Sequence, residues 1–364
     1  MEAVSPSPAL LPGRTRIGRA RIGTEKSPNQ QDVGEPVISS DVSDIAADLA
    51  ANATLLEIAE NLGLSPLLDR GTPFTLAEAT TATGVPEARA LLFLRAMSAA
   101  GLLERDAETG PFMPCAELAD RRYEAGYLSW SLNANRPYID HAERFLREPD
   151  AAGRQHQRDG RRVAVSSRWI GSRGFYPGVL SEIISRKPRH IVDLGSGAGA
   201  LLIRLLTELP TSTGVALDLS PGACEEAERA GRHAQVDDRL RVVNRSVETL
   251  VDDPAPLDGA DIIHAGFVMH DVAQHPEVFA SVLRACREHL ADGGCLVVTD
   301  AVPYVDTPGE RAFSALFSYL HETSMGVRLP TEDRWCELFR QAGFSEVATT
   351  TLGMPGSRLF VATR

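Results

Sequence analysis

The spacing of hydrophobic residues changes character near residue 189. Before that point apolar side chains recur every three or four positions, as at Ile45, Leu49 and Leu56, which is the spacing of amphipathic helices. After it, short apolar runs of strand length alternate with longer stretches of helical spacing. Such alternation is typical of a parallel β-sheet covered by helices on both faces. The pattern therefore predicts a helical first half and an α/β second half.

The second half is expected to supply seven strands. Five apolar runs are predicted to pair in parallel, at residues 190–194, 214–217, 240–243, 261–265 and 294–299. Helices are expected between these strands, at residues 201–209, 221–230 and 276–290. The last two runs, 345–352 and 358–363, are separated only by a short turn, so we expect them to pair antiparallel at an edge of the sheet.

The first half divides into three regions of different composition. Residues 1–40 are rich in Pro, Ser, Gly and Arg, and we interpret them as a disordered tail. Residues 41–115 indicate three helices and a β-ribbon, which together make a winged-helix module. Residues 116–187 are mostly of helical pattern, with a polar stretch at 149–162 that we interpret as a loop. Their many aromatic side chains indicate a connector that also caps a substrate pocket, ahead of the α/β domain at 188–364.

Within the winged-helix module, two local signals decide its interpretation. Thr75 followed three residues later by Glu78 predicts a capping box at the start of a helix. The third helix, near residues 86–100, carries several leucines and only Arg89 and Arg95 as basic residues. Those leucines favour a protein core or a partner subunit over DNA reading. We therefore expect this module to form a homodimer.

Composition and charge narrow the class of protein. The 364 residues are 43% hydrophobic and 24% charged, enough apolar surface for a sizeable core. The net charge of −12 argues against nucleic acid as a partner. Five scattered cysteines without a Cys-x-x-Cys pair argue against a disulfide framework and favour the cytoplasm. No apolar run reaches the length of a membrane helix, so no membrane partner is expected.

The first chemical signal is a glycine-rich sequence between a predicted strand and a predicted helix. Asp193 precedes three glycines at alternating positions, Gly195, Gly197 and Gly199. Glycines there let backbone N–H groups approach a ligand at a helix N-terminus. Asp218 ends the next strand, at about the 20-residue offset of an acid that binds ribose hydroxyls, and Leu219 is suited to pack on adenine. Together they predict a nucleoside-containing cofactor.

The second and third signals are histidines. His270 and Asp271 follow the fourth strand, where ligands of parallel sheets bind, and a neutral imidazole can remove a hydroxyl proton. Asp271 is a candidate to orient His270 or to cap the next helix. His321 lies in a helical segment with Phe317 and Met325 at four-residue spacing, so we expect these three side chains on one face.

The glycine loop, Asp218, the strand order and the antiparallel end resemble the class I S-adenosylmethionine-dependent methyltransferases. With the winged helix, the chain resembles the O-methyltransferase type of natural-product biosynthesis, whose members are typically homodimers. The resemblance implies a Rossmann-like seven-stranded domain that binds S-adenosyl-L-methionine. It also implies that Ser246 stands where many relatives have an adenine-binding Asp, and that His270 is the general base. Substrate-lining side chains are expected at Phe175, Tyr176, Phe267, Phe317, His321 and Met325.

The pair His270 and His321 also resembles a metal-dependent branch of this family, which C-methylates α-keto acids. In that branch two such histidines hold iron, and a Met precedes the first of them where Phe267 stands here. We favour metal-assisted C-methylation of an α-keto or enolisable acid, with iron or zinc at His270 and His321. The alternatives are metal-free O-methylation of a phenol or other hydroxyl, with His270 as base, and a winged-helix regulator that senses S-adenosylmethionine. A further alternative is an enzyme that binds this cofactor, transfers no methyl group and catalyses a rearrangement.

Overall fold

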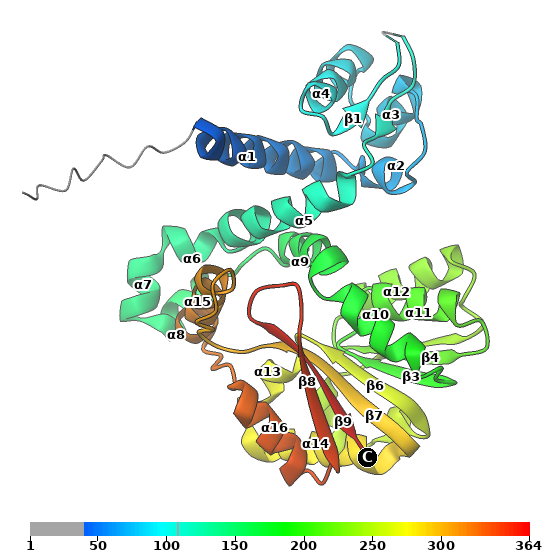
Figure 1. The fold of residues 1–364 in the computed structure, drawn as a ribbon, viewed down its shortest axis with the longest axis vertical. Coiled ribbons are helices and arrows are strands. Elements are labelled where there is room, and N and C mark those ends of the chain that lie inside the picture. The colour runs from blue at the N-terminus through cyan, green and yellow to red at the C-terminus, as the bar shows by residue number, and fades with distance from the viewer. Residues whose placement is uncertain (1–39, 108) are drawn as a thin grey trace, which may run out of the picture. The chain divides into compact units, whose positions relative to one another are not determined.

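The computed structural model describes residues 40–107 and 109–364 (Figure 1). The disordered tail predicted for residues 1–40 lies outside these residues, except for Ser40, where the first helix begins. Contacts join Asp44–Arg364 into one compact unit without further division. The division at residues 115 and 187 therefore stays an interpretation of the sequence.

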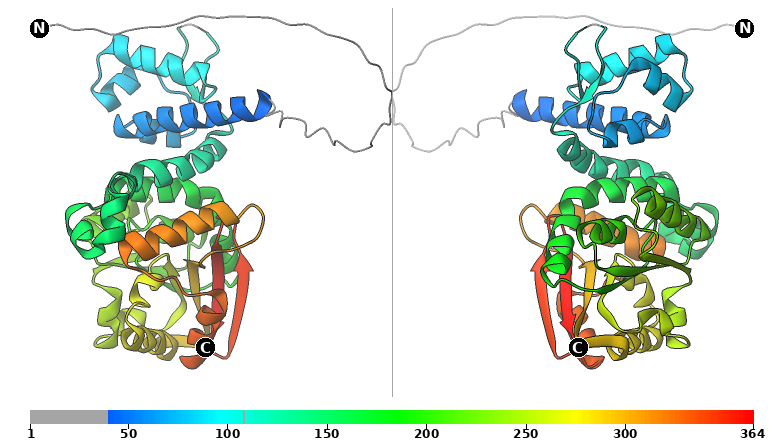
Figure 2. Two further views of the ribbon diagram at one scale, coloured as in Figure 1. Left: turned by 90° about the vertical axis from the view of Figure 1, so that its left-hand side faces the viewer. Right: turned by 90° about the vertical axis from the view of Figure 1, so that its right-hand side faces the viewer.

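A seven-stranded sheet organises the second half, as the sequence predicts. Its order is β5-β4-β3-β6-β7-β9-β8. Five strands are parallel: β3 (His190–Leu194), β4 (Thr213–Asp218), β5 (Leu240–Asn244), β6 (Ala260–Gly266) and β7 (Leu290–Ala301). The last two, β8 (Glu346–Thr351) and β9 (Ser357–Thr363), pair antiparallel along one edge of the sheet (Figure 2).

The strand order reverses between β3 and β6. From β3 the chain adds β4 and β5 on one side, and it then returns to add β6 and β7 on the other. In open α/β sheets such a reversal leaves a crevice beyond the carboxyl ends of the two central strands, because the connecting segments leave in opposite directions. The ends of β3 and β6 are thus the expected place for a ligand.

Alternate residues of each central strand pack into different cores. Val192 and Leu194 belong to one buried cluster and Ile191 to the other, because successive strand side chains point to opposite faces. The first cluster includes side chains of α14 (Pro276–His289) and α16 (Glu332–Gln341). The second includes α10 (Tyr176–Ser185) and α11 (Ala200–Glu208), and Figure 1 shows these two pairs on opposite sides of the sheet. The remaining helix beside this sheet is α12 (Pro221–His233).

The N-terminal helices and ribbon follow the predicted order. The helices are α1 (Ser40–Asn61), α2 (Ser65–Asp69), α3 (Leu76–Thr83) and α4 (Glu87–Ala99), and the ribbon pairs β1 (Leu103–Glu104) with β2 (Met113–Pro114). The capping box is confirmed: the Glu78 N–H donates to the Thr75 hydroxyl, and the Glu78 carboxylate accepts the Thr75 N–H. These elements share one apolar core.

The connecting region is helical almost throughout. It comprises α5 (Leu118–Leu128), the π-helix η1 (Ser129–Ala134), α6 (Arg136–Asp140), α7 (Ala142–Arg147), α8 (Pro149–Gln155) and α9 (Gly160–Gly174). The loop predicted at 149–162 is therefore wrong for all but residues 156–159. Pro149 suits the first turn of α8, and the Asp159 carboxylate caps α9 by accepting the N–H groups of Arg161 and Arg162.

Three later elements complete the surroundings of the crevice. The short helix α13 (Met269–Val272) follows β6, and α15 (Arg311–Leu320) runs directly into the π-helix η4 (His321–Met325). In the part of the chain that the structure describes, each helix is too short or too polar to cross a membrane.

Candidate active site

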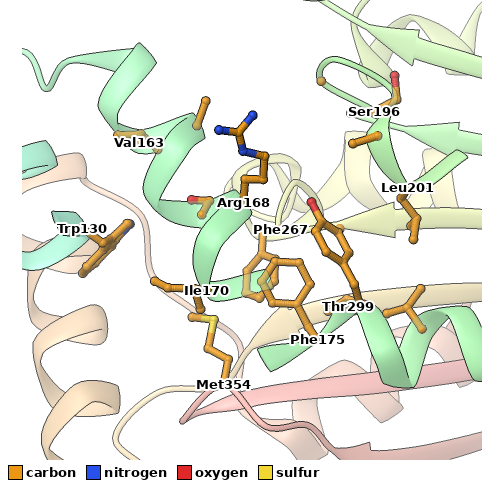
Figure 3. A pocket seen from close by; sticks show the side chains of 18 of the residues that line it. Trp130, Val163, Arg168, Ile170, Phe175, Ser196, Leu201, Phe267, Thr299 and Met354 are labelled. Atoms are coloured by element: carbon orange, nitrogen blue, oxygen red, sulfur yellow. The ribbon is translucent and has the colours of Figure 1, made fainter. Parts of the chain in front are cut away.

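A cavity of about 430 Å³ opens at the carboxyl ends of β3, β6 and β7. Its walls come from the glycine loop, from α9 and α10, from α13 and from α15 with η4. Figure 3 shows Phe175 and Phe267 in its centre, with Trp130 on one side and Ser196 of the glycine loop on the other. The cavity thus lies where the reversal of strand order predicts a ligand site.

The glycine loop lines one end of this cavity and has a conformation that requires glycine. Gly195, Gly197 and Gly199 have φ values of 66°, 54° and 72°, which other residues adopt only with strain. A Cβ at Gly195 would lie 2.9 Å from Val268, whereas Gly197 has open space beside it. The loop therefore leaves its backbone exposed towards the cavity.

Asp218 stabilises this loop from the next strand. Its Oδ2 accepts the Gly197 N–H at 2.8 Å and its Oδ1 accepts the Ser220 N–H at 2.9 Å. Each oxygen keeps a second lone-pair direction for a ligand hydroxyl. Asp218 stands next to the cavity wall but is not part of it. Leu219 beside it is 70% exposed, so its side chain is available to an adenine ring.

Ser246 begins the short helix η2 (Val247–Val251) after β5. Its hydroxyl donates to the carboxylate of Glu248, and it lies outside the cavity wall. The Ser246 hydroxyl therefore already has a partner in Glu248.

Asp193 and His264 form a buried pair at the floor of the cavity. They are directly opposite in the ladder of β3 and β6, and the His264 Nδ1 lies 2.7 Å from the Asp193 Oδ1. Both side chains are at least nine-tenths buried, and both line the cavity. The His264 Nε2 is buried and lacks a hydrogen-bond partner among the described residues, as does the nearby Thr299 hydroxyl. Asp193 was expected at the cofactor site from its place before the glycines, whereas no site role was predicted for His264 or Thr299.

His270 lies on α13 and is oriented by Asp300, which the sequence did not single out as its partner. The His270 Nδ1 is 2.6 Å from the Asp300 Oδ1, and the His270 backbone N–H donates to the Asp300 Oδ2 at 3.1 Å. Because a carboxylate only accepts, Nδ1 carries the proton and Nε2 is left as the basic nitrogen. Asp271 was a candidate to orient this ring or to cap the next helix. Its carboxylate lies 3.6 Å from Nε2, and its side chain is 61% exposed.

The surroundings of His270 favour its charged form. Burial by itself lowers the pKa of an imidazole, but attraction and hydrogen bonding to Asp300 outweigh burial, and Asp271 adds to them, so the pKa of His270 is raised. The pKa of Asp271 is also raised, because the protein around its carboxylate replaces part of the water there, which outweighs the attraction of His270. His270 is therefore a strong base once it has lost its proton.

His321 has the opposite character. Its Nδ1 donates to the Phe317 carbonyl at 2.8 Å, and its ring stacks on Phe317 at 4.0 Å. Burial, and then repulsion from His270, lower the pKa of His321 to about 3, although the carbonyl bond opposes this. The two imidazole rings meet edge to face, 5.3 Å apart. His321 is thus a neutral imidazole whose Nε2 can accept a hydrogen bond.

Most of the expected substrate-lining side chains lie in the cavity wall: Phe175, Tyr176, Phe267, Phe317 and His321. Met325 is the exception, and it requires a correction. Met325 ends the π-helix η4 outside the cavity wall, where it packs against the same apolar cluster as Phe317.

The structure adds wall residues that the sequence analysis did not assign. They are Trp130, Phe313, Met354, Arg158 and Arg168. The Trp130 ring stacks on Phe317 at 5.1 Å, so η1 and α15 together supply an aromatic wall. The aromatic residues of 116–187 predicted a cap over a pocket, but spacing alone does not show which of their side chains line the cavity.

The residues at the glycine end fit a nucleoside cofactor. The unpartnered His264 Nε2 and Thr299 hydroxyl are hydrogen-bonding groups that a ligand in the cavity would satisfy, and the open space beside Gly197 lets a ligand approach the loop. A buried polar group without a partner costs free energy, so such groups around a cavity indicate a ligand.

The residues at the other end do not fit a protein-bound metal ion. Among residues 40–107 and 109–364, no group of three His, Cys, Asp or Glu side chains is arranged to hold one. His270 and His321 have no third protein ligand, because Asp300 is committed to the His270 Nδ1. The iron or zinc expected at this pair therefore lacks a complete set of ligands.

Comparison with known proteins identifies the domain that holds the cavity. Residues 192–296 match the family model of a methyltransferase domain. The aclacinomycin 10-hydroxylase RdmB of Streptomyces purpurascens is 30% identical over 165 residues, 45% of this chain and 42% of that protein. The indolepyruvate C-methyltransferase of Streptomyces griseus is 30% identical over 206 residues, 55% of this chain and 59% of that protein. The chain spans about half the length of the curated relatives it matches.

A solved structure shows the same fold. Human N-acetylserotonin methyltransferase, in complex with S-adenosylmethionine, aligns with a TM-score of 0.56 at 17% identity, over 92% of this chain and 99% of that one. The family match identifies a methyltransferase domain at residues 192–296, and the solved structure shows the same fold over most of the chain. The resemblance drawn from the glycine loop is thereby confirmed, whereas the metal-dependent branch stays a prediction.

Proposed function

We propose that this chain transfers a methyl group from S-adenosyl-L-methionine to a small molecule of natural-product biosynthesis. The observation that supports this most is one cavity with two different ends. One end has hydrogen-bonding groups without partners beside the glycine loop, and the other has an imidazole held in a fixed tautomer. A methyl donor and a proton acceptor are what such a transfer needs.

The cofactor would occupy the glycine end. Asp218 would accept the ribose hydroxyls, Leu219 would pack on the adenine ring, and the His264 Nε2 with Asp193 would bind near the amino acid part. Ser246 would contact the adenine amino group only after releasing Glu248. When bound, S-adenosylmethionine supplies an activated methyl group on a sulfonium sulfur.

His270 would act on the acceptor. Its Nε2 takes the proton of the acceptor as the nucleophile forms, while Asp300 holds the ring and balances the positive charge that His270 gains. His321, which stays neutral, would accept a hydrogen bond from the acceptor and keep it beside His270. The aromatic wall excludes water from the reacting atoms.

This mechanism serves a phenolic O–H or an enolisable C–H without a metal. We do not carry the metal-assisted version forward, because His270 and His321 lack a third protein ligand within the described chain. Elemental analysis and turnover after treatment with a chelator test this choice. Stoichiometric iron or zinc, together with loss of turnover on its removal, would contradict it.

We also propose that the protein is a homodimer formed through its N-terminal helices. Large apolar side chains there are exposed, with Ile45 65% and Leu92 55% accessible. Light scattering on the eluting protein measures the mass directly. A mass near 39 kDa rather than twice that value would contradict a dimer.

Methyl transfer itself is tested with labelled cofactor. The purified protein is incubated with methyl-labelled S-adenosylmethionine and a panel of aromatic hydroxyl and keto compounds. We expect label in at least one product and loss of that label in His270→Ala. Binding of S-adenosylhomocysteine without label transfer to any acceptor would contradict the proposed reaction and leave only a cofactor-binding role.

A further inference from the structure

Two arginines line the cavity, and they differ in their surroundings. Arg168 on α9 is paired with Glu60 at 3.2 Å, and Figure 3 shows its side chain on the side of the cavity that faces Ser196. Arg158 precedes α9, in residues 156–159 between α8 and α9. No ion pair or hydrogen bond joins the Arg158 guanidinium to another residue in the described part of the chain.

Arg158 belongs to the acceptor end of the cavity. It is half-buried and shares the cavity wall with His270, His321 and Asp271. The positive charge of Arg158 lowers the pKa of His270, Asp271 and His321. Arg168, and not Arg158, contributes in the same way to the pKa of Tyr176. The two arginines thus serve opposite ends of one cavity.

A guanidinium without a partner in an otherwise largely aromatic wall is costly unless a ligand pairs with it. Burial removes water from a charged group, and a planar carboxylate restores the lost hydrogen bonds through two parallel contacts. Asp271 also lines this wall, but it is 61% exposed, and among the described residues it forms no ion pair with Arg158. The partner of Arg158 is therefore expected to come from the ligand.

We propose that the methyl acceptor is an aromatic carboxylic acid whose carboxylate binds Arg158. The proposal rests on the proposed function, and it names the substrate class. A carboxylate fits better than a phosphate group, because one guanidinium matches one negative charge and the acceptor end also contains Asp271 and Asp300. With the carboxylate at Arg158, the ring of the acceptor lies among Trp130, Phe313 and Phe317, and its reacting atom faces His270.

Calorimetric titration of the protein saturated with S-adenosylhomocysteine tests the proposal. The probes are a hydroxynaphthoic acid and an arylpyruvic acid, each beside its neutral carboxamide. We expect the protein to bind at least one acid roughly 10- to 100-fold more tightly than its carboxamide, the range for a partly buried charged hydrogen-bonded pair. Arg158→Gln should remove this preference by weakening the acid alone, and Arg158→Lys should restore part of it.

The matched control is Arg154→Gln. Arg154 is an exposed arginine in the last turn of α8 and lies outside the cavity wall. Its substitution should therefore leave the preference for acid over carboxamide unchanged. Equal affinity for acid and carboxamide in the unaltered protein, or equal weakening of both by Arg158→Gln, would overturn the proposal. Failure of every acid to bind would also overturn it, whereas loss of S-adenosylhomocysteine binding would instead refute the proposed function.

Discussion

Individual side chains set the chemistry of the site through the His270–Asp300 pair. The Asp300 carboxylate is fully buried and accepts from both the ring and the backbone of His270, so ring position and tautomer are fixed together. The short helix α13 therefore needs no further contact to present Nε2 to the cavity. Spacing along the chain placed His270 beyond β6, but it did not connect His270 with an acid thirty residues later on β7.

The first prediction concerns that acid. Asp300→Asn should lower kcat by roughly 100-fold or more, because the amide neither fixes the tautomer nor balances the charge on His270. Steady-state methyl transfer measures this loss. The control Asp271→Asn should change kcat by less than about tenfold. Asp271 is exposed, and its 3.6 Å distance from Nε2 is too long for a hydrogen bond to the ring. Equal losses in the two variants would contradict the assignment.

The second prediction is a pH dependence. His270 acts as a base only when neutral, and its pKa is raised above the usual 6.5 by Asp300 and Asp271 despite burial, with His321 and Arg158 also facing it. Turnover should therefore be low at acidic pH and rise through a midpoint above pH 6.5. In Asp300→Asn the midpoint should move to lower pH, because the attraction that raises the pKa is gone. A midpoint that does not move would exclude His270 as the titrating base.

The third prediction concerns His264 at the cofactor end. His264→Asn keeps an N–H for Asp193 but loses the unpartnered Nε2. We expect the Kd for S-adenosylhomocysteine to rise roughly 3- to 10-fold, the value of one hydrogen bond, while the KM of the acceptor stays the same. His190→Asn, at the other end of β3, is the control and should not affect the Kd. An unchanged Kd in His264→Asn would show that Nε2 does not contact the cofactor.

Among the secondary-structure elements, α15 with η4 forms one wall of the cavity and is tied to the sheet by Arg358. This buried arginine on β9 binds Glu310, which precedes α15, and Glu332 at the start of α16. Glu310 also accepts the Gly356 N–H. The tie holds Phe317 and His321 over the strand ends.

The fourth prediction follows from this tie. Arg358→Ala should cost roughly 3 kcal/mol of unfolding free energy, because it leaves carboxylates without their partner in a partly buried place. Urea unfolding measures it. The pKa of Glu310 is lowered: burial opposes the charge, but Arg358 and Gly356 outweigh burial. The contribution of Glu310 is therefore present above the usual carboxyl pKa and lost as pH falls through its lowered value, so the two proteins should converge in acid. A constant difference down to low pH would contradict this.

The strands were predictable from sequence because the sheet is buried on both faces. Runs such as residues 190–194 are continuous and apolar, so each strand was found to within a few residues of its observed ends, apart from the early start of β7. The polar stretch at 149–162 misled because α8 begins with Pro149 and α9 with the capping residue Asp159, rather than with apolar periodicity. Met325 packs against the aromatic cluster but outside the cavity wall, and spacing along the chain does not distinguish these two places.

In the molecule as a whole, the reversal of strand order between β3 and β6 explains why the candidate site residues lie together at the carboxyl ends of these strands. The glycine loop, the Asp193–His264 pair and His270 come from segments separated by up to about eighty residues, yet all line one cavity. The sequence indicated the two ends of this cavity. It also indicated a cap from residues 116–187, but not that Trp130, Arg158 and Arg168 line the cavity, because their inward orientation depends on tertiary packing.

The most direct measurement is a crystal structure of the protein with S-adenosylhomocysteine and an aromatic acid. We predict the ribose hydroxyls at Asp218, the sulfur between the glycine loop and the acceptor, and the reacting atom of the acid within hydrogen-bond reach of the His270 Nε2. A nucleoside bound elsewhere, an empty crevice beside Gly197, or a ring of His270 turned away from the acid would contradict this description of the site.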